Sequence, residues 1–206
     1  MTRTLSRALI LSAVLAVVFT SHASAQIIFS AGGGSPRTDG GKVVGISLNG
    51  TGQTITSLGF YDQGQDGIAG TYQLGLWDSS QNLLATTTVT PSSPLTGDFR
   101  YAAITPVTLT SSPFTIGVLL PPDPPDVWLD NVTLVLGVGY TGAGTGQFSG
   151  PSGSLVCPSN FDTSSYYVVN ANGPAPPVPE PGMLALMLAT ASCAVFTRRN
   201  RRFNKP

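Results

Sequence analysis

Short runs rich in valine, isoleucine, threonine and aromatic residues alternate with glycine, proline, asparagine and aspartate through most of this 206-residue chain. Such runs, separated by turn-forming residues, are typical of β-strands, and no convincing helical period interrupts them after Gly41. The pattern predicts an all-β domain over residues 26–171, built as a two-sheet antiparallel sandwich of jelly-roll-like form. We expect strands at 43–48, 55–61, 72–77, 83–90, 99–104, 107–109, 114–120, 132–139 and 166–169.

Residues 72–90 form the clearest unit of this pattern. Leu74 and Leu76 share one face of the first run, whereas Gln73 and Trp77 share the other, which is the alternation of a half-buried strand. A polar turn then returns the chain into two further leucines. We expect a hairpin whose register is fixed by buried leucines on both strands.

The first 25 residues have the three-part organisation of a secretory signal peptide. A start with two arginines precedes an almost wholly apolar run at 8–19, and Ala23 and Ala25 place small residues before Gln26. We expect a signal helix that signal peptidase removes before Gln26. An uncleaved membrane anchor is the alternative, although the apolar run is well short of the ~20 residues that span a bilayer.

The C-terminal segment 179–202 repeats this organisation in a different order. A proline-glutamate-proline motif precedes an apolar stretch, which we expect to form a transmembrane helix with the arginines that follow on the cytoplasmic side. Residues 172–178 form a proline-rich spacer before the motif, which favours extended conformations. An ordinary single-pass anchor is the alternative. The pattern is carried by Pro179, Glu180, Pro181, Arg198, Arg199, Arg201 and Arg202.

The VPEP sequence at 178–181, followed by one apolar helix and a closing arginine cluster, resembles the PEP-CTERM sorting signal. This resemblance implies that exosortase processes the tail after the helix has held the precursor in the membrane. Polar residues within the apolar stretch and four residues after the arginines depart from the pattern. Residues 55–100 are also similar to a β-rich domain, without an assigned activity, that recurs in front of PEP-CTERM tails.

Charge and histidine content exclude several functions for the body of the chain, residues 26–178. This range carries three cations and nine aspartates, a net charge of −6, so nucleic acid and anionic lipid are poor partners. The only histidine, His22, lies in the signal segment, so the body has no imidazole for catalysis or zinc binding. Its one cysteine, Cys157, cannot form a disulfide within it. We expect a protein that is not an enzyme; an all-aspartate acid–base pair is the remaining catalytic alternative.

A possible calcium site begins at Asp62. Asp62 and Asp66 stand at positions one and five of a glycine-containing loop, which partly matches the start of a calcium-binding loop. Position three is Gly64, which offers only a backbone oxygen as a ligand. Position twelve, where a bidentate glutamate belongs, is Gln73. Asp78 or backbone carbonyls would have to complete the site. We expect no cofactor, with calcium as the alternative and a strand-connecting turn as the simpler interpretation.

Three residues suggest contacts with a glycan. Trp128 follows the proline-rich stretch 121–125, which we expect to form an extended loop that exposes the ring. Trp77 is a second aromatic candidate. Arg100 either forms an ion pair across the sheet or presents its guanidinium group to a sugar or carboxylate.

These observations lead to one expected function and one alternative. We expect an exported protein, first anchored in the inner membrane and then placed at the cell surface or in the extracellular matrix, with a structural or adhesive role. Its processing partners are signal peptidase and exosortase. The alternative is a secreted carbohydrate-binding module whose partner is an extracellular polysaccharide.

Overall fold

The structure, a computed structural model, describes residues 26–173. The predicted signal peptide, the sorting tail and most of the spacer lie outside this range. The described residues form strands, loops and a one-turn 3-10 helix, η1 (Gln63–Gln65). Within this range, no helix has the length and apolar character needed to cross a membrane.

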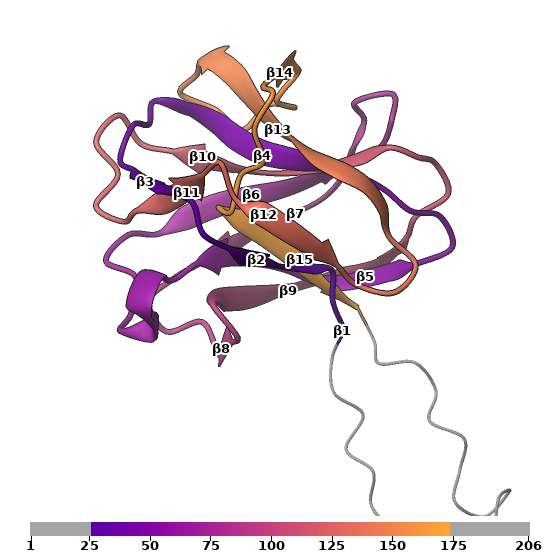
Figure 1. The fold of residues 1–206 in the computed structure, drawn as a ribbon, viewed down its shortest axis with the longest axis horizontal. Coiled ribbons are helices and arrows are strands. Elements are labelled where there is room, and N and C mark those ends of the chain that lie inside the picture. Colours follow the sequence, from indigo (N-terminus) through magenta and orange to yellow (C-terminus); the bar gives the residue numbers. More distant parts are fainter. Residues whose placement is uncertain (1–25, 174–206) are drawn as a thin grey trace, which may run out of the picture. The chain divides into compact units, whose positions relative to one another are not determined.

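Two larger antiparallel sheets and two small ones make up the fold (Figure 1). The larger sheets lie one above the other, and side chains from both meet in one core. The prediction of an all-β antiparallel fold is confirmed, although the strands form four sheets instead of two.

The five-stranded sheet has the order β1 (Gln26–Ile27), β15 (Val169–Gly173), β5 (Thr54–Tyr61), β9 (Phe99–Thr108) and β8 (Leu95–Thr96). The six-stranded sheet has the order β14 (Asn160–Phe161), β13 (Thr141–Pro151), β4 (Lys42–Asn49), β10 (Phe114–Leu120), β6 (Tyr72–Trp77) and β7 (Leu83–Val89). The small sheets pair β11 (Trp128–Asp130) with β3 (Ser35–Arg37), and β12 (Thr133–Leu136) with β2 (Phe29–Gly32).

Alternate residues of the facing strands fill the core between the two larger sheets. In β4 the core residues are Val44, Ile46 and Leu48, which is the period of two that a pleated strand requires. Phe60 of β5 and Tyr72 of β6 belong to different sheets, and their rings stack with centroids 3.8 Å apart. Fully burying a side chain of this size contributes roughly 1.5–3 kcal/mol. Apolar burial therefore holds the two sheets together.

Five strands with a period-two pattern begin and end within one residue of the predicted bounds, namely β4, β5, β6, β7 and β10. The two strands predicted at 99–104 and 107–109 are one continuous strand, β9. Pro106 lies between these predictions, and the pairing of β9 with β5 changes register at this point. Proline has no backbone N–H to donate to the neighbouring strand. It is tolerated at such an irregularity because the regular ladder of hydrogen bonds is interrupted there.

The longest strand, β13, was not predicted. It contains four glycines, a composition that disfavours strands in sequence-based reasoning. One of them, Gly146, is required by its neighbours, because a Cβ atom there would lie 2.7 Å from the backbone oxygen of Ser164 and 3.0 Å from the ring of Tyr166. This glycine therefore serves a tertiary contact that no local pattern reveals.

Three further predictions differ from the structure. The strand predicted at 166–169 lies later in the chain, as β15, and Tyr167 forms only an isolated bridge with Leu129. The last two residues of β15, Asn172 and Gly173, pair with Ser57 and Gln26, so the sheet extends two residues into the predicted spacer. The strand predicted at 132–139 shortens to β12, and β2 and β3 occupy a glycine-rich stretch where no strand was predicted.

The predicted hairpin exists as β6 and β7, but leucines do not fix its register. Leu83 is 52% exposed and Leu84 is 38% exposed, so the expectation of buried leucines on the second strand is wrong. The turn is instead held by Asp78, whose Oδ1 accepts hydrogen bonds from the backbone N–H groups of Ser80 and Asn82, both at 2.9 Å. An Asx-type turn therefore replaces leucine packing as the local determinant.

We predict that Gly146→Ala destabilises the protein by about 1–3 kcal/mol, because the new methyl group meets the backbone of Ser164. The matched control is Gly150→Ala in the same strand, where a Cβ atom would meet nothing within 4 Å. Urea denaturation of both variants measures the difference. Equal stability of the two variants would contradict this account of β13.

Candidate functional site

Asp62, the first candidate calcium ligand, is engaged within the protein. Its side chain is 1% exposed, and Oδ2 accepts a hydrogen bond of 2.7 Å from Nε of Arg100. Oδ1 accepts the backbone N–H of Gly67 at 3.1 Å. Nη1 of Arg100 also donates to the carbonyl oxygens of Pro91 and Ser93. Arg100 therefore ties the loop after β5 to β9 and to the segment that precedes β8.

Asp78 is not brought together with Asp62. Asp78 follows the six-residue strand β6, which spans about 20 Å at ~3.3 Å per residue, while Asp62 lies near the start of that strand. Asp66 is exposed directly after η1. Among residues 26–173, no group of three or more histidine, cysteine, aspartate or glutamate side chains is placed to hold a metal ion. The geometry at Asp62 is that of a strand-connecting turn.

The expected exposure of Trp128 is wrong, because its side chain is only 1% exposed. The indole Nε1 donates to the backbone oxygen of Asp39 at 3.2 Å, and the guanidinium group of Arg37 lies 5.2 Å from the ring centroid. Tyr166 contacts the ring edge-on at 5.1 Å. The proline-rich loop thus leads the indole into the protein, where it is not available to stack on a sugar.

Trp77 is also buried, at 3% exposure, but on the outer side of the six-stranded sheet. Its indole lies over Gly75 of β6 and Gly117 of β10, where Cβ atoms would approach the ring to 2.5 and 3.3 Å. Pro158 also approaches Gly117, from the segment between β13 and β14. The glycines make room for the indole, and that segment lies over the same part of the sheet. None of the three predicted glycan contacts therefore presents a free group, since Arg100 is committed to Asp62.

The carboxylates of the described domain bind its own loops. Asp126 is the clearest case, because it accepts the backbone N–H groups of Ala69 and Gly70 at 2.8 Å and the hydroxyl of Tyr72 at 2.6 Å. Charge-assisted hydrogen bonds of this kind are shorter and stronger than neutral ones. Asp126 thereby fastens the proline-rich loop to the start of β6.

Six other aspartates have the same role. Asp98 accepts the hydroxyl of Tyr167 at 3.0 Å, and Asp162 accepts the hydroxyl of Tyr166 at 2.5 Å. The remaining four are Asp39, Asp62, Asp78 and Asp130, each with a hydrogen bond to a loop or strand group. Seven of the nine aspartates are thus used in structure; Asp66 and Asp123 are exposed.

Several of these contacts shift a pKa value. Burial acts to raise the pKa of Asp39, but hydrogen bonds from Arg37 and Lys42 outweigh it and hold that pKa at about 2. The hydrogen bond from Tyr166 holds the pKa of Asp162 below its ordinary value. Burial, followed by the hydrogen bond to Asp126, raises the pKa of Tyr72 well above its ordinary range. These carboxylates are therefore ionised, and this tyrosine neutral, at ordinary pH.

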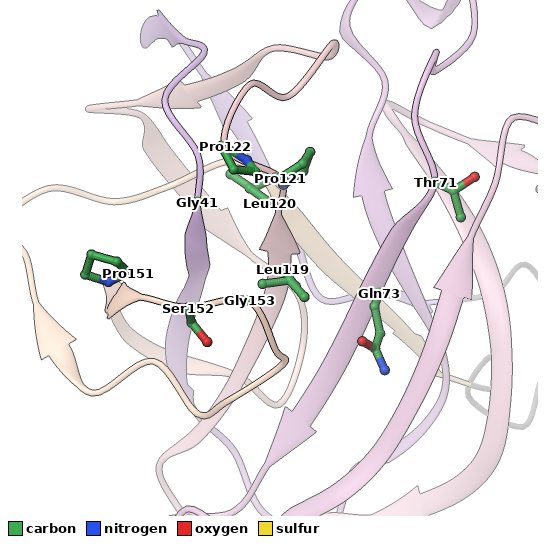
Figure 2. Close-up of a pocket in the computed structure, with 10 residues that line it drawn as sticks. All are labelled: Gly41, Thr71, Gln73, Leu119, Leu120, Pro121, Pro122, Pro151, Ser152 and Gly153. Carbon is green, nitrogen blue, oxygen red and sulfur yellow. The ribbon is translucent and has the colours of Figure 1, made fainter.

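A hollow of about 650 Å³ lies on the outer side of the six-stranded sheet (Figure 2). Thr71 and Gln73 form one wall, Ser152 lies on the opposite wall, and Leu119 lies between them. The other lining residues are glycines, prolines and Leu120. The hollow can offer hydrogen bonds and apolar contact, but it contains no titratable side chain for acid–base chemistry.

Two smaller hollows on this sheet share a residue that sequence reasoning missed, Phe161. Its signal in the sequence is weak, because it is a single phenylalanine among serines, asparagine and aspartate. Cys157 lines one of these hollows, where burial, and then the charge of Asp78, raises the pKa of its thiol to about 11. The sulfur is therefore a thiol at neutral pH and a poor nucleophile.

We predict that Asp126→Asn destabilises the protein by about 1–3 kcal/mol, because an uncharged amide replaces a carboxylate that accepts three hydrogen bonds. The control is Asp123→Asn in the same loop, which is exposed and should change stability by less than about 0.5 kcal/mol. Urea denaturation measures both. Equal effects would show that loss of negative charge, and not of this contact, is what matters.

We predict a plateau of stability between about pH 4 and pH 10. Folding lowers the pKa of Asp39 below 3.8, so its contribution is present above that value and is lost as the pH falls toward 2. Burial raises the pKa of the tyrosines above 10.0, so their contribution is complete below pH 10 and is lost as the pH rises through the raised values. The tyrosines concerned are Tyr61, Tyr72, Tyr101, Tyr140, Tyr166 and Tyr167.

The measurement is the free energy of unfolding at a series of pH values, together with the absorbance of tyrosinate. We expect tyrosinate to form only as the fold is lost. Ionisation near pH 10 with the fold intact would contradict the burial of these hydroxyl groups.

Comparisons with protein-family models, with curated proteins and with solved structures found no match to this chain.

Proposed function

We propose that this chain is an exported, non-enzymatic protein of the cell surface or extracellular matrix, with a structural or adhesive role. The observation that carries the location is the order of the C-terminal segment: the motif at 179–181, an apolar stretch and the arginine cluster. That order resembles a PEP-CTERM sorting signal. In the proposed route, signal peptidase cuts before Gln26, the tail helix holds the precursor in the inner membrane, and exosortase cuts near the motif.

A passive role is supported by how the domain uses its charged groups. A general acid or base needs a titratable group that is free to exchange a proton with a substrate in a cavity. The hollow beside Gln73 contains no such group, and seven of nine aspartates are hydrogen-bonded to the domain itself. The arrangement favours a stable scaffold over a catalyst.

The ends of the described domain are compatible with processing at both termini. Gln26 in β1 pairs directly with Gly173 in β15, so the first and last described residues lie side by side at the same end of two neighbouring strands (Figure 1). Removal of a segment before Gln26 and of one well after Gly173 would leave the core strands untouched. We further propose that the two larger sheets form a jelly-roll-like sandwich, carried between a signal helix and a transmembrane helix.

We predict that replacing Pro179, Glu180 and Pro181 by alanine blocks processing of the tail. The native protein should lack the arginines at 198–202 when it is isolated from the cell surface or medium, whereas the variant should retain them and stay with the membrane. Mass spectrometry of both mature proteins measures the termini. The control replaces Pro176 and Pro177 in the spacer, which should leave processing unchanged.

A native surface protein with its C-terminus intact through Arg202 would overturn the proposed sorting. A protein found in the cytosol with both ends retained would overturn the proposed export as well.

A further inference from the structure

Phe161 is an aromatic side chain without cover. It lies in the two-residue edge strand β14 and is 72% exposed, whereas every tyrosine and tryptophan of residues 26–173 is at most 9% exposed. A phenylalanine ring that stays in water does not gain the free energy that the buried rings gain when their apolar surface is removed from water. Phe161 therefore stands out as a candidate contact for a ligand.

The sheet places a polar side chain beside this ring. Phe161 is the register partner of Gln147 in β13, so both side chains lie on the same face of the sheet. Gln147 is the partner of Gly45 in β4, whose neighbours Val44 and Ile46 face the core, so this face is the outer one.

Gln147 is held rigidly in this position. It is only 5% exposed, and its Oε1 accepts a hydrogen bond of 3.2 Å from the hydroxyl of Thr115 in β10. A carboxamide also carries two N–H donors, and the bond with Thr115 uses only its oxygen. The ring and the amide are thus presented together by paired strands, which lowers the ordering cost of binding.

Hollows of about 130 and 210 Å³ adjoin the ring. Both are lined by Phe161, Ser47 and Pro113, so they lie next to each other, and together they are treated as one groove. Gln147 and Thr115 line the smaller hollow, and other polar side chains complete the groove. These are Asp78, Ser79, Gln81, Ser159, Asn49 and Thr145.

We propose that this groove, here called the Phe161 groove, binds a neutral polysaccharide. One face of a sugar ring consists of C–H groups that pack on an aromatic ring, while its hydroxyl groups need donors and acceptors at the rim. Phe161 supplies the apolar platform, and the amides and hydroxyls on either side supply the hydrogen bonds. Two hollows that adjoin one ring suit a chain that continues beyond a single sugar.

The charge of the groove selects against anionic ligands. No lysine or arginine lines either hollow, and the one charged side chain there is Asp78. A uronic acid, sulfate or phosphate group would meet a carboxylate without a compensating cation, within a domain whose body carries a net charge of −6. The polysaccharide is therefore neutral.

This inference deepens the adhesive part of the proposed function, and it replaces Trp77, Trp128 and Arg100 as the basis of glycan binding. Its test does not require sorting of the tail. The full chain is purified in a detergent without a sugar headgroup, because such a headgroup would compete for the groove. Binding is measured by depletion onto cellulose, insoluble xylan and mannan, with cross-linked alginate as the anionic probe.

We expect the wild-type chain to bind at least one of the three neutral polysaccharides and to ignore alginate, with little dependence on salt. Phe161→Ala should weaken this binding at least about tenfold, as expected for an aromatic anchor at the centre of a site. Phe161→Tyr keeps the ring and should retain binding. Val135→Ala is the control, since Val135 is a 64% exposed apolar side chain on β12 that lines neither hollow. Circular dichroism should be the same for all four proteins.

Three results would overturn this inference. The first is no binding to any neutral polysaccharide, or binding that Phe161→Ala leaves unchanged. The second is tighter binding to alginate than to the neutral polysaccharides. The third is a wild-type chain that sediments as a dimer and a Phe161→Ala variant that sediments as a monomer, since the ring would then join two copies of the chain. A wild-type chain that binds no neutral polysaccharide but has a normally processed tail would reject the groove and leave the proposed sorting intact.

Discussion

Hydrogen bonds from loops to aspartate carboxylates are the interaction on which the described domain depends. With one cysteine among residues 26–173, no disulfide can tie its long loops to the sheets. Asp126 fastens its loop to Tyr72, and Asp62 fastens another to Arg100. Burying a carboxylate is costly unless donors surround it, so each contact holds the loop and at the same time satisfies the carboxylate. The same hydrogen bonds commit these carboxylates to the loops of the domain itself.

The outer side of the six-stranded sheet shows how a sequence can build a second, smaller apolar cluster away from the core. Trp77 lies over Gly75 and Gly117, and the chain segment after β13 brings Pro158 against Gly117. That segment ends in β14, which carries Phe161. Covering one aromatic ring with this segment therefore brings a second ring to the surface, at a position held by strand pairing with Gln147.

Much of the central fold could be predicted from the sequence, because β4, β5, β6, β7 and β10 carry the alternation that half-buried strands require. The remainder depends on tertiary contacts. The glycines of β13 are explained by neighbours such as Ser164, and a glycine-rich stretch by itself predicts a loop. Of the site residues, the ion-pair interpretation of Arg100 matches the structure, whereas Trp128 follows prolines that suggested exposure and is covered by Arg37 and Asp39. The exposure of Phe161 had only a weak local signal, its polar neighbours in the sequence, since exposure depends on whether another segment of the described domain covers the ring.

A rigid domain that presents a preformed Phe161 groove is physically consistent with the adhesive role that we propose in the extracellular matrix. A weak contact per copy is sufficient to hold a long polymer, because many copies of the protein can bind one polymer chain at the same time. What matters is that each copy presents its contact without further ordering. Phe161 and Gln147 satisfy that condition, because adjacent strands hold both residues and the hydrogen bond with Thr115 orients the amide. Of the carboxylate contacts that hold the loops, the turn at Asp78 lies at the groove itself, because Asp78 and Ser79 line its smaller hollow. At this turn the stability of the domain is linked to the function that we propose for it.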